Sequence, residues 1–314
     1  MADGTRLEMK SAIVNGSLGT IGLALINQLL KRGVRVYAIA LPGDPRIERI
    51  PEDAAVIPCD MREIGKLTEM IDGPVDAFFQ LAWAGTIGPG RDDMLLQTGN
   101  IRCAIEAAQT AKRLGCEVFV GVGSQAEHGR VEGRVTASAP CFPTNGYGMA
   151  KLCAGQMTRA VCRQLGVRHV WARVLSVYGV NDGPLSVISI ILDKLFRGEA
   201  PALTAGEQMW DYIYAEDAGD ALCCMAEAGR DGAIYPVGSG TARPLREYFE
   251  MLRDAVDPRL PLGLGEIPYP PNQVMRLEAD ISQLTRDTGF TPATPFEAGI
   301  REVVAQYRQR LVNG

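Results

Sequence analysis

The sequence predicts an α/β fold built on one parallel sheet, and three features of the chain lead to this prediction. Short apolar strands alternate with longer helical patterns from residue 11 to about residue 178. A glycine-rich turn connects the first strand to the first helix. After about residue 179 the pattern breaks, and Pro and Gly become frequent. Because repeated strand–helix units form a parallel sheet with helices on both faces, we expect a doubly wound sheet followed by a smaller region.

The strands of the expected sheet cover residues 12–14, 34–40, 54–58, 75–82, 117–122 and 168–177. Helical patterns fill the gaps, notably at residues 23–30, 100–114 and 148–165. In such folds ligands bind beyond the carboxyl ends of the strands. Ser124 and the loop after Ala82 fall at those ends, so we expect the functional site there.

Two domains are predicted from this pattern. Residues 10–178 are expected to form a dinucleotide-binding domain of the Rossmann type. Residues 179–314 are expected to form mainly a smaller C-terminal α/β region that binds substrate. Residues 211–237 are expected to return to the first domain, because 217–229 reads as a helix.

The glycine-rich turn has the context that a dinucleotide site requires, which is strand, glycines and helix in that order. Gly16 permits a tight turn, Gly19 lets the backbone approach a pyrophosphate, and Gly22 lets the helix pack closely. The helix N-terminus then offers free N–H groups and a positive dipole end to the phosphates. The predicted contacts come from Gly16, Ser17, Leu18, Gly19, Thr20, Ile21 and Gly22.

A second motif places Tyr147 and Lys151 four residues apart, which stacks their side chains on one face of a helix. A phenol has an unperturbed pKa of about 10 and is a poor base near neutrality. A neighbouring ammonium favours the phenolate and lowers that pKa. We therefore expect Lys151 to make Tyr147 a group that exchanges a proton with a hydroxyl or a ketone.

Composition narrows the class of protein. The chain has 314 residues, of which 46% are apolar and 22% charged, which is ordinary for a globular protein. A net charge of −5 without a basic tract argues against nucleic-acid binding. No apolar run approaches the roughly 20 residues needed to span a bilayer, and residues 1–11 lack the apolar region of a signal peptide. The eight cysteines form no C-x-x-C pair and there are only two histidines, so we expect no metal site and a cytoplasmic protein with reduced thiols.

The chain resembles the extended short-chain dehydrogenases/reductases. The resemblance is carried by the glycine turn and by Ser124, Tyr147 and Lys151. Within this group of enzymes the chain resembles the NAD-dependent epimerase/dehydratase family, which acts on nucleotide sugars. The resemblance covers about residues 10–310. It extends to segments 59–62, 81–85, 123–129, 173–179, 210–217, 279–282 and 288–292.

The resemblance implies roles for particular residues. Ser124, Tyr147 and Lys151 would be catalytic, with Ser124 bonded to the reacting sugar oxygen and Lys151 also bonded to the nicotinamide ribose. Asp60 would accept a hydrogen bond from the adenine amino group, with Met61 beside it. Leu81, Ala82 and Trp83 would line the cofactor. A homodimer is also implied, formed by the helices within 92–114 and 147–165.

Departures from the family pattern refine the function. Dehydratases of this family carry an acidic pair directly after the Ser/Thr position, where this chain has Gln125 and Ala126. Neither side chain can act as an acid, so we disfavour 4,6-dehydration. The run from Ser124 to Glu127 resembles nucleotide-sugar 4-ketoreductases of the kind that make dideoxyhexoses. A C4 epimerase that retains its NAD is the close alternative, and a dinucleotide-sensing protein without catalysis is a third.

The cofactor and the substrate contacts are less constrained. The second strand ends at Ala40, where NAD-dependent members usually carry an acid that binds the ribose. Arg46 or Ser17 can reach a 2′-phosphate there, whereas Asp44 can serve NAD, and we lean to NADP over NAD. Predicted substrate-binding residues are Ser124, Gln125, Ser176 and Arg276.

Overall fold

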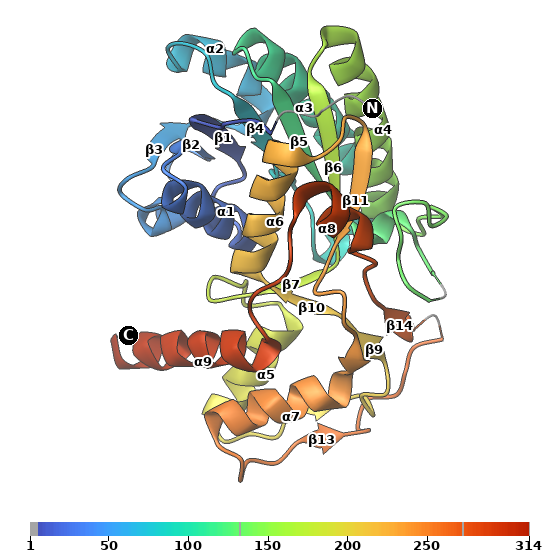
Figure 1. Ribbon diagram of the computed structural model, residues 1–314. Coiled ribbons are helices and arrows are strands. Elements are labelled where there is room, and N and C mark those ends of the chain that lie inside the picture. Colours follow the sequence, from blue (N-terminus) through green and yellow to red (C-terminus); the bar gives the residue numbers. More distant parts are fainter. Residues whose placement is uncertain (1–5, 132, 272, 314) are drawn as a thin grey trace.

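A seven-stranded parallel sheet forms the centre of the molecule in the computed structural model, which describes residues 6–131, 133–271 and 273–313 (Figure 1). Its strands are β1 (Ser11–Asn15), β2 (Arg35–Ala40), β3 (Ala55–Pro58), β4 (Ala77–Gln80), β5 (Val118–Ser124), β6 (Arg168–Val174) and β11 (Ala233–Val237). The order is β11-β6-β5-β4-β1-β2-β3, with every neighbouring pair parallel. The predicted Rossmann-type sheet is confirmed; residues 1–5 of the N-terminal segment lie outside the described chain.

Helices cover both faces of the sheet. One face packs against α1 (Thr20–Lys31), α6 (Ala215–Ala228) and α8 (Ser282–Thr288), and the other against α2 (Leu67–Met70), α3 (Met94–Arg113) and α4 (Gly146–Leu165). Successive side chains of a strand point to opposite faces, so Ile13 joins the core under α3 while Val14 joins the core under α1. Burial on both faces explains why these strands read as continuous apolar runs.

The strand order reverses between β1 and β4, and this is where an α/β sheet of this kind opens a crevice. Asn15 and Gln80 end these two strands, and their buried side chains share a hydrogen bond of 2.7 Å. The chain then continues as Gly16 on one side and as Leu81 and Ala82 on the other. The ends of β5 and β6 lie at the same edge of the sheet.

The strand expected at residues 168–177 is interrupted in the structure. β6 ends at Val174, and residues Ser176–Tyr178 form a separate strand, β7, which pairs in parallel with β10 (Tyr212–Tyr214) outside the main sheet. Leu175 donates its backbone N–H to Val237 at the end of β11. Residues 168–177 read as one strand in the sequence, but the last of them pair with a different strand.

A smaller region, below the sheet in Figure 1, contains the remaining long helices, α5 (Val187–Phe196), α7 (Leu245–Val256) and α9 (Phe296–Asn313). They enclose a core that includes Leu192, Phe249 and Ile300. Its short strands are β8 (Ala202–Leu203), β9 (Met209–Trp210), β12 (Arg243–Pro244), β13 (Gly263–Leu264) and β14 (Arg276–Leu277). Short 3-10 helices also occur, namely η1 (Pro45–Arg49), η2 (Met61–Lys66), η3 (Gly88–Asp92) and η4 (Gln125–Glu127). The division at residue 178 stays a prediction.

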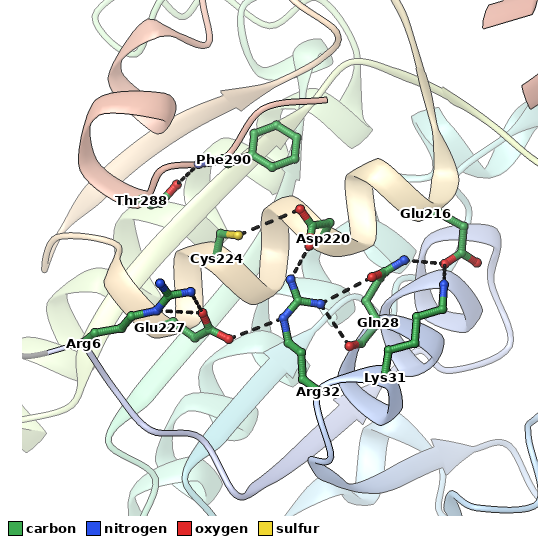
Figure 2. Close-up of polar contacts among 10 residues, drawn as sticks. All are labelled: Arg6, Gln28, Lys31, Arg32, Glu216, Asp220, Cys224, Glu227, Thr288 and Phe290. Carbon is green, nitrogen blue, oxygen red and sulfur yellow. Dashed lines mark hydrogen bonds and ion pairs between the residues drawn. The ribbon is translucent and has the colours of Figure 1, made fainter. Parts of the chain in front are cut away.

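The returning helix α6 is held against α1 by polar contacts along its edge, which Figure 2 shows. Gln28 donates to Glu216 at 2.7 Å, and Arg32 pairs with both Asp220 and Glu227. The helices approach so closely at Gly219 that a Cβ there would lie 2.8 Å from the α1 backbone. Glycine, which has no Cβ, permits this approach. This packing attaches the second half of the chain to the helix that follows the glycine turn.

Candidate active site

The glycine turn has the geometry that the sequence predicts. Gly16 has φ +98°, in the region that favours glycine, and a Cβ there would lie 2.5 Å from the backbone nitrogen of Ala82. A Cβ on Gly22 would lie 2.2 Å from the carbonyl oxygen of Gly16, so this glycine lets the first turn of α1 pack on the loop. A Cβ on Gly19 would meet only one atom, at 3.8 Å, which leaves that face open to a ligand.

The N-terminus of α1 is suited to phosphate. The helix begins at Thr20, and its N-cap residue, Gly19, has no side chain to satisfy the first N–H groups. No acidic residue lies in the first turn. Free N–H groups and the positive end of the helix dipole therefore face the open side of the turn, which fits the pyrophosphate of a dinucleotide.

The residues expected at the adenosine end already have hydrogen-bond partners within the chain. Ser17 is buried and donates its hydroxyl to the carbonyl of Ile39 at 2.7 Å, so the expectation that it reaches a 2′-phosphate is wrong. Arg46 and Asp44 form a bidentate pair, at 2.9 and 2.6 Å, which lowers the pKa of Asp44 to about 2. Because Asp44 and Arg46 neutralise each other, their contacts favour neither NAD nor NADP.

Asp60 lies where the sequence places it, at the end of β3. Its carboxylate caps η2 by accepting from the backbone of Arg62 at 2.9 Å and pairs with the Arg62 side chain. These contacts lower the pKa of Asp60 and keep it ionised, so it is an acceptor. Met61 follows it at the start of η2.

Ser124 ends β5 and caps η4. Its hydroxyl accepts from the backbone of Ala126 at 3.2 Å, and its own backbone N–H donates to Glu127 Oε1 at 2.8 Å. This reciprocal arrangement is a capping box. It fixes the serine at the carboxyl edge of the sheet.

Tyr147 and Lys151 share a buried face of α4, as their spacing predicts. Lys151 is 3% exposed, and its Nζ donates to the carbonyl of Val122 at 2.7 Å. The same Nζ lies 3.9 Å from the centre of the Trp83 ring. Burial lowers the pKa of Lys151 to about 7, because a desolvated ammonium is unfavourable.

Tyr147 is brought next to Ser124, since the strand end and the helix start meet at this edge. Burial raises the pKa of the Tyr147 phenol, whereas hydrogen bonding with Ser124 and the charge of Arg91 lower it. Arg91 lies over the ring, 4.4 Å from its centre, and Lys151 is 5.9 Å away. The sequence-based expectation that Lys151 lowers this pKa is therefore wrong in the structure. The pKa is raised, Lys151 is not among the groups that lower it, and the cation nearest the ring centre is Arg91.

The loop after β4 covers this pair. Trp83 meets the Tyr147 ring edge-on with 6.3 Å between centres and donates its indole N–H to Gln97 at 2.8 Å. The buried amide of Gln97 also donates to the carbonyls of Gly85 and Gly90, and the amide of Asn100 bonds the backbone of Ala84 in both directions. The amides of α3 thus shape a loop that encloses the catalytic candidates.

Glu127 is fully buried behind Ser124 and has a structural role that the sequence did not indicate. Its carboxylate accepts from Trp171 at 3.0 Å and pairs with Arg173 at 2.7 Å, in addition to the Ser124 N–H. Gly123 makes room, because a Cβ there would lie 2.0 Å from the carboxylate. Glu127 therefore cannot supply the acid that Gln125 and Ala126 lack.

The predicted substrate residues are only partly brought together. Gln125 and Arg276 line one small cavity, together with His128. Arg276 is half exposed and pairs with Glu278 at 2.7 Å. Ser176 lies apart from that cavity and accepts a hydrogen bond from the indole of Trp210 at 2.8 Å. Its hydroxyl proton remains available to a ligand.

Arg91 and the role of Glu127 had no signal in the sequence. Arg91 lies in a Gly- and Pro-containing loop without periodicity, and its place over Tyr147 depends on contacts with α3 and α4. Within the described ranges, no cluster of three or more His, Cys, Asp or Glu residues has a geometry that could hold a metal ion. No helix in that part of the chain is long and apolar enough to cross a membrane.

Comparison with known proteins places this chain in a family. Residues 12–238 match the sequence profile of the NAD dependent epimerase/dehydratase family. A dTDP-glucose 4,6-dehydratase of Xanthomonas campestris pv. campestris strain B100 is 26% identical over 328 residues, which cover 95% of this chain and 93% of that protein. The chain spans about half the length of the first curated relatives that it matches.

Solved structures share the fold over almost the whole chain. UDP-N-acetylglucosamine 4-epimerase from Methanobrevibacter ruminantium has a TM-score of 0.86 and 21% identity, covering 97% of this chain and 100% of its own. RMD from Pseudomonas aeruginosa, solved with NADPH, has a TM-score of 0.81 and 19% identity, covering 96% and 99%. At such identities the likeness establishes the fold, and the function must be argued from the site.

Proposed function

The chain belongs to the NAD-dependent epimerase/dehydratase family, and from this premise we propose that it is a nicotinamide-dependent 4-ketoreductase of a nucleotide-linked hexose or deoxyhexose. The observation behind the proposal is that Ser124 ends β5 beside the Tyr147 phenol, whose pKa it lowers, and that no acid directly follows the serine. Transfer of a hydride and a proton needs the serine and the phenol side by side. Elimination of water would also need an acid at one of the two positions after Ser124, where the chain has Gln125 and Ala126.

The dinucleotide would lie across the crevice between β1 and β4. Its pyrophosphate would bind the turn from Gly16 to Gly22, and Asp60 and Met61 would face the adenine. Leu81, Ala82 and Trp83 would line the nicotinamide side, and Lys151 would bond the ribose. The bound cofactor supplies the hydride. Since Lys151 now donates to Val122 and lies against Trp83, we expect both side chains to adjust when a ribose enters.

The protein's part of the reaction is proton transfer. Ser124 donates a hydrogen bond to the oxygen at C4 and holds it near Tyr147. As the carbonyl oxygen gains negative charge, the Tyr147 hydroxyl gives it a proton and becomes a phenolate. Positive charge near the ring stabilises that phenolate. In the oxidative direction the same phenolate accepts the proton of the sugar hydroxyl.

The proposal extends to the substrate contacts, the cofactor and the assembly. Gln125 and Arg276, which share a cavity, would bind the sugar and the diphosphate, because a guanidinium can grip phosphate oxygens bidentately. Ser176 would contact the sugar. We lean to NADP as the cofactor because β2 ends at Ala40 without an acid. A homodimer through α3 and α4 is supported by Leu95, which is 87% exposed, and by the half-exposed Met149 and Met157.

The alternative is a C4 epimerase, which would use the same residues but oxidise and then reduce the sugar. The two functions differ in net redox change. A panel of nucleotide sugars and their 4-keto forms, followed by the absorbance of NADPH and NADH, separates them. A reductase consumes the cofactor stoichiometrically, whereas an epimerase interconverts two sugars without net consumption.

Tyr147→Phe tests the proposed chemistry. We expect kcat to fall on the order of 10²-fold or more, because the variant has no proton to exchange. Cofactor affinity, measured by fluorescence titration with NADPH, should change little. Ser124→Ala is the matched variant and should also lower kcat. Unaltered turnover in Tyr147→Phe would exclude Tyr147 as the acid.

A further inference from the structure

The phenol of Tyr147 has an arginine on its ring. The guanidinium carbon of Arg91 lies 4.4 Å from the ring centre. The Lys151 ammonium is farther away, at 5.9 Å, and its hydrogen bond goes to the Val122 carbonyl. It also lies against the Trp83 ring, at 3.9 Å. The closest positive charge therefore comes from the loop after β4 and not from α4.

Arg91 is held in place by the loop that carries it. Its guanidinium donates to the carbonyl of Thr86 at 2.8 Å. The neighbouring Asp92 accepts from the backbone N–H of Gly146 at 2.9 Å, one residue before Tyr147. Gln97 donates to the carbonyl of Gly90 at 2.8 Å. These contacts attach η3 to both α3 and the first turn of α4, so Arg91 does not reach the ring as a free surface side chain.

The charge of Arg91 is not neutralised nearby. Among residues 6–131, 133–271 and 273–313, no carboxylate oxygen lies within 4.0 Å of its guanidinium nitrogens. Arg46 and Arg62 differ in this respect, since each pairs with an aspartate. Arg91 thus presents a full positive charge to the phenol.

We propose that Arg91 is a second cation of the active site, which stabilises the phenolate of Tyr147 through its contact with the ring. This inference rests on the proposed function and deepens it. A cation over an aromatic ring is attracted by the ring itself, and a phenolate adds a full negative charge to that attraction. A guanidinium keeps its charge at every working pH.

The other charged groups around Tyr147 leave this role to Arg91. Lys151 on α4 is buried, and its pKa falls to about 7, so it loses its charge in the range where the phenolate forms. Glu127 on η4 is negative and acts in the opposite direction, raising the pKa of Tyr147. Ser124 at the end of β5 contributes a hydrogen bond but no charge. Trp83 is neutral.

The first test needs no substrate. Arg91→Met removes the charge and keeps much of the bulk, and Arg91→Lys keeps the charge. Arg102→Met, an exposed arginine of α3, is the matched control. Stopped-flow pH jumps, read by phenolate absorbance, give the Tyr147 titration as the difference from Tyr147→Phe in each background. We expect Arg91→Met to raise the midpoint of the Tyr147 titration by about one pH unit. Arg91→Lys should bring the midpoint most of the way back to its value in the natural chain. Arg102→Met should leave the midpoint unchanged.

The second test uses turnover in the oxidative direction. At a pH below the Tyr147 midpoint, Arg91→Met should lower kcat about tenfold, because a one-unit shift leaves about a tenth of the phenolate. KM and cofactor affinity should change little. On the Tyr147→Phe background the Arg91 effect should vanish. If Arg91 only supports the fold, Arg91→Met should lower kcat by the same factor with and without the Tyr147 hydroxyl.

The outcomes separate this inference from the proposed function. An unshifted titration in Arg91→Met, or an equal loss of kcat with and without the phenol, overturns the role of Arg91 even if the reductase activity is found. A shifted titration supports that role even if every nucleotide sugar in the panel fails. In that case the proposed substrate is wrong, and the stabilising contact of Arg91 with the phenol remains.

Discussion

The two sides of the candidate active site are built in different ways. Ser124 rests on a carboxylate that is fully buried, and Glu127 binds the serine backbone, Trp171 and Arg173 at once. Tyr147 is covered by a loop whose arginine is only partly buried and bonds a carbonyl. One side is an ion pair within the core of the sheet, and the other is a charge at the rim of the cleft.

The difference shows how a buried charge and a partly exposed charge affect the stability of the fold. A buried ion pair has lost its hydration, so removing one partner leaves an uncompensated charge in a medium that stabilises it poorly. A charge at the rim keeps much of its hydration, and its effect on the fold is small. Removing Glu127 should therefore mainly lower the stability of the fold. Removing the charge of Arg91 should mainly alter the chemistry.

The largest expected effect is on the Ser124 side. Glu127→Ala leaves Arg173 buried and unpaired and should lower the free energy of unfolding by about 3–5 kcal/mol. Urea denaturation of the purified variant measures it. Lys66→Ala breaks the exposed pair with Glu63 and is the control, with little change expected.

A second variant shows whether charge burial is the cause. Glu127→Met combined with Arg173→Met removes both charges and replaces them with apolar side chains. This double variant should recover much of the stability that Glu127→Ala loses, as buried pairs replaced by apolar groups often do. If the double variant is as unstable as the sum of its single changes, packing and not charge explains the loss, and the comparison of the two sides fails.

The pH dependence of stability gives the next effect, through Lys151. Its pKa is about 7 in the folded chain and about 10.4 when unfolded. Between these values the unfolded chain binds a proton that the folded chain does not, so stability rises with pH by up to about 1.4 kcal/mol per unit. Below pH 7 Lys151 is protonated in both the folded and the unfolded chain. The folded state then carries the full free-energy cost of burying the ammonium.

Lys151→Met removes that slope. In urea denaturation at about pH 7, 8 and 9, the stability of the variant relative to the natural chain should be greatest at the lowest pH and should decline as pH rises. Lys10→Met, at an exposed lysine, should run parallel to the natural chain. Parallel curves for Lys151→Met would mean that its ammonium titrates normally and is not desolvated by Trp83 and the sheet.

Much of this fold was readable from the sequence because its signals are local. The period of the apolar residues predicts the strands, and glycine at positions 16 and 22 is required by contacts within one turn. The meeting of Ser124 with Tyr147 also follows, since parallel strand ends and the next helix share one edge. The break at Leu175 was missed because β7 pairs with β10, which is far along the chain.

Electrostatics of the site could not be predicted from motifs. The spacing of Tyr147 and Lys151 is correct, yet which cation reaches the phenol depends on how far each side chain is desolvated and on loop contacts from α3. Glu127 reads as an ordinary residue of a family motif, and only the fold brings Arg173 and Trp171 to it. Long-range packing decides these pairings.

The smallest expected effect separates the two sides by their response to salt. Between about 0.1 M and about 1 M salt the screening length falls from about 10 Å to about 3 Å. Arg91 lies at the solvent-facing rim, so the ratio of kcat between the natural chain and Arg91→Met should shrink by about two- to threefold over this range. The stability lost in Glu127→Ala should hardly change, because its partner is buried and little screened. If the kcat ratio for Arg91→Met and the stability loss of Glu127→Ala respond equally to salt, Arg91 and Glu127 are equally screened. The contrast between a buried charge beside Ser124 and a partly exposed charge beside Tyr147 then does not hold.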